Sequence, residues 1–167
     1  MPLSPLGLLD RVFHDRTNQT TPATSVLPLQ GLTVLAVEDS RFASDALRLM
    51  CQRSGARLRR VDTLNAAYAH LRVYRPDVML VDLGLPDGRG DALICDLARH
   101  RPQGPIVIGI SGDTSGQAVA MMAGAHGFIE KPFPSLARFQ NEILRHLPDR
   151  AVRAVPDTGD LSPIADP

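Results

Sequence analysis

The sequence predicts a single α/β domain in which a five-stranded parallel sheet lies between two layers of helices. Between residues 31 and 148, short apolar runs alternate five times with longer segments of helical periodicity. The apolar runs are continuous, which is typical of parallel strands that are buried on both faces. Right-handed crossovers would place helices on both sides of the sheet, which gives a doubly wound, three-layer sandwich.

The first two β–α units are read from the N-terminal half of this region. The apolar run over residues 32–37 predicts the first strand, and apolar residues spaced i, i+3, i+4 and i+7 over 43–50 predict the first helix. Residues 58–61 predict a weaker strand, and the helical spacing returns over 64–71.

Each of the other three units is a short buried run followed by a helical pattern. Asp113 or Thr114 is expected to cap the middle one of these helices. The expected pairs are strand 78–81 with helix 91–99, strand 105–110 with a helix that ends at residue 123, and strand 127–130 with a helix over 136–147.

Composition divides the chain into three regions. Residues 1–30 form an N-terminal extension with an apolar patch over 6–13, which suits either a short amphipathic helix or a frayed terminus. Residues 31–148 form the patterned domain. Residues 149–167 contain several proline residues and few large apolar side chains, so a disordered C-terminal tail is expected.

Composition and charge narrow the class of protein. Lys plus Arg and Asp plus Glu both total 18, so the basic excess of a nucleic-acid-binding protein is missing. Cys51 and Cys95 fall in predicted helices without CxxC spacing, which indicates reduced thiols. No apolar run approaches the ~20 residues that span a bilayer, and no signal peptide is recognised. A cytoplasmic protein without membrane or nucleic-acid contact is therefore expected.

Three arginines, Arg57, Arg59 and Arg60, lie on the second predicted strand. Charged side chains on an edge strand block unwanted strand pairing, so an edge position is the favoured interpretation. A nucleic-acid-binding patch is the alternative.

Polar residues stand where four of the five predicted strands end. Glu38 and Asp39 follow the first strand, Asp82 the third, Ser111 the fourth and Lys131 the fifth. In doubly wound sheets, the functional crevice lies at the carboxyl ends of the strands. Three carboxylates in one pocket repel one another unless they share cations. One lysine and one Mg²⁺ ion, which prefers oxygen ligands and phosphate, would supply that charge.

The lysine at this edge stands out because the chain has seventeen arginines and one lysine, Lys131. A compact ammonium group reaches a phosphate oxygen as a point charge, whereas a forked guanidinium needs more room. Its position therefore indicates a phosphate contact, although a single lysine can also stand at a strand end by chance.

The segments VLAVEDS, DVMLVDLGLPDGRGD, PIVIGISGD and GFIEKPF together resemble the receiver domain of two-component response regulators, and in particular stand-alone, chemotaxis-regulator-like receivers. The resemblance covers residues 31–148 and implies a flavodoxin-like (βα)5 fold. It implies that Asp82 accepts a phosphoryl group from a histidine kinase or a histidine phosphotransfer protein. Asp39 would bind Mg²⁺ directly, Glu38 would act through a water or as a lesser ligand, and the Gly84 carbonyl would complete the metal contacts.

The same resemblance implies a conformational switch at the ends of the fourth and fifth strands. Ser111 and Lys131 would each bind a phosphoryl oxygen, and Phe128 would follow Ser111 inward after transfer. Phe128 stands where the family commonly has tyrosine, so it keeps the packing role and loses a hydroxyl. The peptide bond before Pro132 would be cis.

The expected function is that of a single-domain response regulator, a phosphoacceptor and not an enzyme beyond its own phosphotransfer and autodephosphorylation. Its output would be contact with a downstream target protein across the fourth helix, fifth strand and fifth helix, with a homodimer as a further option. A phosphorylation-independent scaffold on the same fold is the alternative. A phosphohydrolase is disfavoured, because such enzymes usually place a second aspartate where Gly84 stands. Chemotaxis, a phosphorelay shuttle and a phosphate sink remain open.

Overall fold

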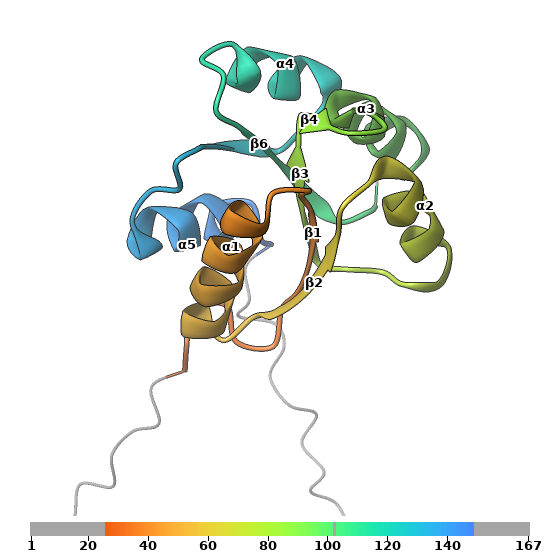
Figure 1. Cartoon of the computed structure of the whole chain (residues 1–167). Helices are drawn as coiled ribbons and strands as arrows, with labels where there is room; N and C mark the ends of the chain where they lie inside the picture. The colour runs from red at the N-terminus through yellow and green to blue at the C-terminus, as the bar shows by residue number, and fades with distance from the viewer. Residues whose placement is uncertain (1–25, 102, 149–167) are drawn as a thin grey trace, which may run out of the picture.

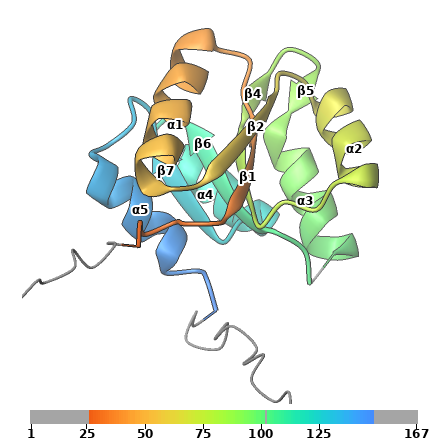
Figure 2. The same cartoon turned by 90° about the horizontal axis from the view of Figure 1, so that it is seen from below.

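The computed structural model describes residues 26–101 and 103–148. In this part of the chain, five parallel strands form one sheet in the order β2-β1-β3-β6-β7. Helices α1 and α5 cover one face, and α2, α3 and α4 cover the other (Figure 1, Figure 2). The predicted doubly wound α/β fold is confirmed.

The expected order of strands and helices is observed, with small changes at their ends. Two further two-residue strands, β4 and β5, pair antiparallel after β3 and were not predicted, because two residues are too few to show a period. The elements are β1 (Thr33–Val37), α1 (Arg41–Ser54), β2 (Arg57–Val61), α2 (Leu64–Val73), β3 (Val78–Asp82), β4 (Gly84–Leu85), β5 (Gly88–Arg89), α3 (Gly90–His100), β6 (Ile106–Ser111), α4 (Gly116–Ala123), β7 (Gly127–Glu130) and α5 (Leu136–Leu144).

Burial along the strands follows their place in the sheet. Every residue of the central strands β3 and β6 is buried, which explains their continuous apolar runs. Strand β2 is an edge strand and exposes Arg57, Arg59 and Arg60. The edge interpretation of these arginines is thus confirmed, and Arg60 has an additional contact described below.

The core consists of two apolar layers, one on each face of the sheet. Side chains of β1 alternate between them: Val34 and Ala36 pack with α1 and α5, and Leu35 and Val37 pack with α2 and α3. Leu29 belongs to the first layer with no exposed surface, and its N–H donates to the Ser54 carbonyl. Leu29, which precedes the expected domain start at residue 31, is therefore part of the packed core.

Side chains cap the N-termini of α1, α2 and α5 but not those of α3 and α4. The hydroxyls of Ser40 and Thr63 accept hydrogen bonds at the N-termini of α1 and α2. The prediction that Asp113 or Thr114 caps α4 is wrong, because this helix begins at Gly116 after Ser115. Asp113 instead accepts hydrogen bonds from the N–H and hydroxyl of Ser115, which closes a turn before the helix.

Two sequence-based expectations concern residues outside the described part of the chain. These are the amphipathic helix over 6–13 and the disordered tail over 149–167. Among the helices that the structure does describe, none combines the length and the apolar character needed to cross a membrane.

The two cysteines differ in access, which predicts a selective modification. Cys51 is 1% exposed in α1, and burial raises the pKa of its thiol to about 12. Cys95 is half-buried in α3. Because alkylation requires an accessible thiolate, we expect iodoacetamide to label Cys95 in the folded protein and Cys51 only after unfolding. Peptide mass spectrometry checks this, and labelling of native Cys51 would contradict the packing of α1.

Candidate functional site

The carboxyl ends of β1, β3, β6 and β7 bring five predicted site residues to one edge of the sheet. Glu38 and Asp39 directly follow β1, and Asp82 is the last residue of the adjacent strand β3. Ser111 ends β6, and Lys131 directly follows β7. The site is thus assembled by parallel pairing of strands that are distant in the sequence.

The three carboxylates form one cluster. One carboxylate oxygen from each of Glu38, Asp39 and Asp82 lies within 4.8 Å of the other two. Glu38 is fully buried, Asp82 is 5% exposed, and Asp39 is exposed at the mouth of the cluster. A set made only of oxygen donors, with one open side, fits a hard divalent cation such as Mg²⁺ that keeps some of its waters.

The ammonium group of Lys131 lies between the two buried carboxylates. Its Nζ is 2.9 Å from Asp82 Oδ2 and 3.2 Å from Glu38 Oε2. Burial works to lower the pKa of Lys131, but the hydrogen bonds and charges of Asp82 and Glu38 outweigh it, so the pKa is raised. The lysine therefore stays charged near neutral pH. The bond from Lys131 to Pro132 is cis, as the resemblance implied.

The surroundings of Glu38 raise the pKa of its carboxyl group. Burial raises its pKa, and the charge of Asp82 raises it further. The Ser40 N–H, 2.9 Å from Glu38 Oε1, and the Lys131 ammonium both act in the opposite direction. The net pKa is above that of a free glutamate. A cation bound at this cluster would therefore reduce the repulsion between the Glu38 and Asp82 carboxylates.

Arg60 holds the backbone beneath the carboxylates. Its Nε donates to the Glu38 carbonyl and its Nη2 to the Asp39 carbonyl, both at 3.0 Å. One guanidinium thus clamps two consecutive peptide groups of the loop after β1. Sequence reasoning missed this contact, because nothing in the spacing of an arginine on the neighbouring strand identifies a backbone carbonyl as its target.

Two glycines bring backbone close to Asp82. The Gly84 N–H lies 3.2 Å from Asp82 Oδ1, so this residue contacts the carboxylate through its backbone. The Gly90 N–H donates to the Leu83 carbonyl, and a Cβ atom at Gly90 would lie 1.9 Å from the Asp82 carbonyl oxygen. The first residue of α3 must therefore lack a side chain for β3 to end where it does.

Ser111 and Phe128 lie together beside the start of α4. A Cβ atom at Gly116 would be 3.0 Å from Ser111 Oγ and 3.1 Å from Phe128 Cζ, so both side chains border one small space. Ser111 is 9% exposed and its hydroxyl accepts from the Asp113 N–H. Phe128 is half-buried against the second apolar layer and lies outside the carboxylate cluster.

Comparison with known proteins gives concordant results. Residues 34–143 match the model of the response regulator receiver domain. The KDP operon transcriptional regulatory protein KdpE of Escherichia coli K12 is 32% identical over 136 residues, and the transcriptional regulatory protein PhoP of E. coli O157:H7 is 30% identical over 137 residues. These alignments cover 77% and 78% of this chain but 60% and 61% of the relatives, so the relatives are longer.

Solved structures show the same fold. The beryllofluoride-activated NtrC4 receiver domain dimer has a TM-score of 0.61 at 29% identity, covering 68% of this chain and 93% of that chain. The receiver domain of NtrX from Brucella abortus has a TM-score of 0.60 at 26% identity, covering 68% and 99%. With the predicted strand-end residues gathered at one edge of the sheet and the family model matched over residues 34–143, this chain belongs to the response regulator receiver domain family of two-component systems.

Proposed function

We propose that this chain is a Mg²⁺-dependent phosphoacceptor that receives a phosphoryl group on Asp82 from a histidine kinase or a histidine phosphotransfer protein. The observation that carries the proposal is the pair of contacts from Lys131 Nζ to Asp82 and Glu38 inside the carboxylate cluster. Family membership supplies the class of phosphodonor.

Asp82 has the chemistry of a nucleophile for this reaction. Its carboxylate needs no general base, because a carboxyl group is ionised at neutral pH. In the transfer, the phosphorus–nitrogen bond of a phosphohistidine breaks, a phosphorus–oxygen bond to Asp82 forms, and the histidine nitrogen keeps the electron pair. Phosphoryl transfer requires little beyond alignment and neutralisation of charge on the phosphoryl oxygens.

The surrounding residues would supply that neutralisation. Lys131 is already 2.9 Å from the accepting carboxylate and can remain beside a phosphoryl oxygen. Glu38, Asp39 and Asp82 would hold Mg²⁺, with the Gly84 carbonyl as a further ligand. When bound, the ion supplies positive charge to the reacting oxygens and to the carboxylates around it.

Ser111 and Phe128 would transmit the conformational change that follows phosphorylation. Bonding of the Ser111 hydroxyl to a phosphoryl oxygen would move it from its contact with the Asp113 N–H. Because Ser111 and Phe128 border the same space next to Gly116, a shift of one requires an adjustment of the other. The changed surface over α4, β7 and α5 would then contact a target protein in the cytoplasm, as a signalling module and not as an enzyme.

The relatives give a second candidate for the output of the whole protein. KdpE and PhoP are named as transcriptional regulatory proteins, and this chain spans about 60% of their length. Transcriptional output would then come from a partner or a further region, and the charge balance of this chain still predicts no nucleic-acid contact by the receiver domain itself. The NtrC4 receiver domain is a dimer. We therefore propose that the oligomeric state of this chain be measured, with a homodimer as one expected outcome.

The proposal is tested by incubation with acetyl phosphate, with Mg²⁺ and with EDTA. We expect one added phosphoryl group by intact mass spectrometry with Mg²⁺ and none with EDTA. If the folded protein binds Mg²⁺ yet takes up no label from acetyl phosphate or from a phosphorylated kinase, the phosphorylation-independent scaffold is correct. Label that forms equally in EDTA would refute the metal requirement.

The clamp made by Arg60 predicts a change in metal affinity. We expect Arg60→Gln and Arg60→Lys to weaken Mg²⁺ binding, each by roughly tenfold, because neither side chain can hold the carbonyls of Glu38 and Asp39 together. Mg²⁺ titration followed by NMR measures this. If only the charge of Arg60 mattered, Arg60→Gln would tighten binding and Arg60→Lys would leave it unchanged.

A further inference from the structure

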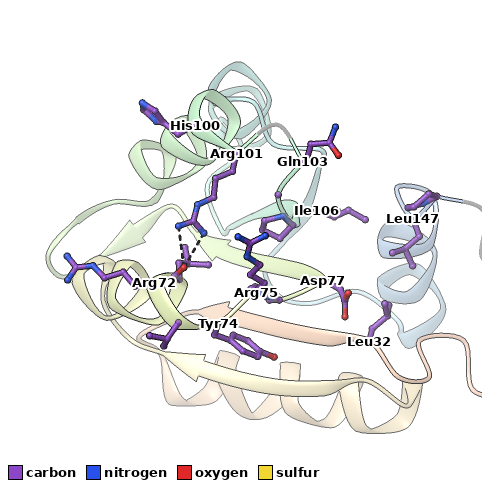
Figure 3. Close-up of a pocket in the computed structure, with 16 residues that line it drawn as sticks. Leu32, Arg72, Tyr74, Arg75, Asp77, His100, Arg101, Gln103, Ile106 and Leu147 are labelled. Atoms are coloured by element: carbon purple, nitrogen blue, oxygen red, sulfur yellow. Dashed lines mark hydrogen bonds between the residues drawn. The ribbon is translucent and has the colours of Figure 1, made fainter.

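A groove of about 1090 Å³ lies at the end of the sheet opposite the carboxylate cluster. It is bordered by the α2–β3 loop, the α3–β6 loop and the residues after α5 (Figure 3). Apolar side chains line part of it, among them Leu71, Ile106 and Leu147. Val73, which also lines the groove, is 88% exposed. Leu71 and Ile106 are buried at its floor and Leu147 is half-buried, so Val73 is the apolar side chain named here that a binding partner can cover.

Arginines give the groove its charge. Arg72, Arg75 and Arg101 all line it, and in Figure 3 Arg75 and Arg101 extend into it from its two sides. Among the described lining residues, the one carboxylate is that of Asp77. Its Oδ2 accepts hydrogen bonds from both the N–H and the hydroxyl of Thr33 at 2.8 Å. Three arginines thus line the groove, and the one carboxylate among its described lining residues is already hydrogen-bonded to Thr33.

Two of the arginines are free to bind an anion. The Nη atoms of Arg101 donate to the Leu71 carbonyl at 3.3 and 3.2 Å, which fixes this side chain at the end of α2. The side chains of Arg72 and Arg75 are exposed and make no hydrogen bond or ion pair with any residue of the ranges 26–101 and 103–148. Guanidinium groups bind carboxylates with paired hydrogen bonds. The groove therefore fits an acidic peptide with some apolar side chains.

The chain itself supplies such a peptide at the edge of the groove. Leu147 and Pro148, the last described residues, are among its lining residues. The segment over 154–167 has no lysine or arginine. Its acidic residues and its leucine and isoleucine are, in order, Asp157, Asp160, Leu161, Ile164 and Asp166.

We propose that residues 154–167 bind in this groove of the same chain. Asp157 and Asp160 would pair with Arg72 and Arg75, and the apolar residues of the segment would cover the exposed apolar lining. The intervening residues 149–153 span up to ~17 Å when extended, so the segment begins within that distance of Pro148, which itself lines the groove. A tether this short gives an effective concentration in the millimolar range, so a weak contact suffices to keep the segment bound.

The groove and the carboxylate cluster lie at opposite ends of the sheet, so this binding would need no contact with the phosphorylation site. Its consequence is that the arginines of the groove are closed to other acidic partners until the segment leaves. The groove would then act as an internal binding site for the region that follows the receiver domain.

Charge reversal in the full chain tests the proposal, with ¹⁵N relaxation of the amides over 157–161 as the readout. We expect order parameters above ~0.6 in the unmodified chain and below this value in Arg72→Glu/Arg75→Glu. Adding Asp157→Arg/Asp160→Arg to that variant should restore order. The control Arg48→Glu/Arg138→Glu reverses two exposed arginines outside the groove and should leave the segment ordered.

Three results would overturn the proposal. The first is a segment that is already mobile in the unmodified chain. The second is a segment that stays ordered in Arg72→Glu/Arg75→Glu, or is released equally by Arg48→Glu/Arg138→Glu. The third is ordering that appears only as the concentration rises, together with a doubled mass in sedimentation, because a second copy would then supply the segment.

Discussion

Replacement of Asp82 by Asn is expected to abolish phosphorylation by acetyl phosphate in the presence of Mg²⁺. The amide is a poor nucleophile, and it removes one of three negative charges that the proposed cation shares with Glu38 and Asp39. Asn has nearly the same shape as Asp, so its amide can still lie beside Gly84 and Lys131. The expected readout is complete loss of the added phosphoryl mass with an unchanged circular dichroism spectrum.

A matched variant separates loss of the acceptor from loss of an ordinary surface charge. Asp45→Asn removes an exposed carboxylate on α1, away from the cluster, and should be phosphorylated like the unmodified protein. If Asp82→Asn is still labelled, peptide mapping identifies the true acceptor. Label on Asp39 would overturn the assignment of Asp82 while leaving the receiver function intact.

Replacement of Gly90 by Ala is expected to cause the largest loss of stability from a single added methyl group. The new Cβ would lie 1.9 Å from the Asp82 carbonyl oxygen and 3.0 Å from Val81 Cγ1. The nearest atom is a backbone carbonyl oxygen at the end of a fully buried strand, so rotating a side chain cannot relieve the clash. We expect a loss of roughly 3 kcal/mol in the free energy of unfolding, at the upper end of the usual cost of overpacking.

Gly84→Ala is the control for this change, because it adds the same methyl group two residues after Asp82. A Cβ at Gly84 has no heavy atom within 4 Å, and the residue is exposed. Its effect on stability should stay within about 0.5 kcal/mol. Urea unfolding of both variants measures the difference, and equal stabilities would show that α3 can move away from β3 at little cost.

The sequence was sufficient to predict the carboxylate cluster because its members follow strands of one parallel sheet. Once the apolar runs were assigned as parallel strands, Glu38, Asp82 and Lys131 had to meet at one edge. The structure places the lysine ammonium between the two buried carboxylates, as charge balance required. The structure thus bears on where these residues lie, and the roles assigned to all the site residues remain predictions: Glu38, Asp39, Asp82, Gly84, Ser111, Phe128 and Lys131.

The features that the sequence did not predict depend on contacts with backbone or on loop geometry. Arg60 binds two carbonyls, and every residue has a carbonyl, so no residue type marks the partner. Gly90 is required by the approach of α3 to the end of β3, which depends on the path of the β4–β5 turn. Leu29 joins the core from a short turn that has no periodicity.

The path of the chain has a practical consequence for protein engineering. Pro148, the last described residue, lines the groove at the end of the sheet away from the carboxylate cluster. The chain enters the domain at the same end, where the Leu29 N–H donates to the Ser54 carbonyl at the C-terminus of α1. A fluorescent reporter attached before residue 26 would leave the phosphodonor's route to Asp82 unobstructed. A reporter inserted directly after Pro148 would instead crowd the groove that this residue lines. A biosensor for phosphorylation should therefore carry its label on the N-terminal side.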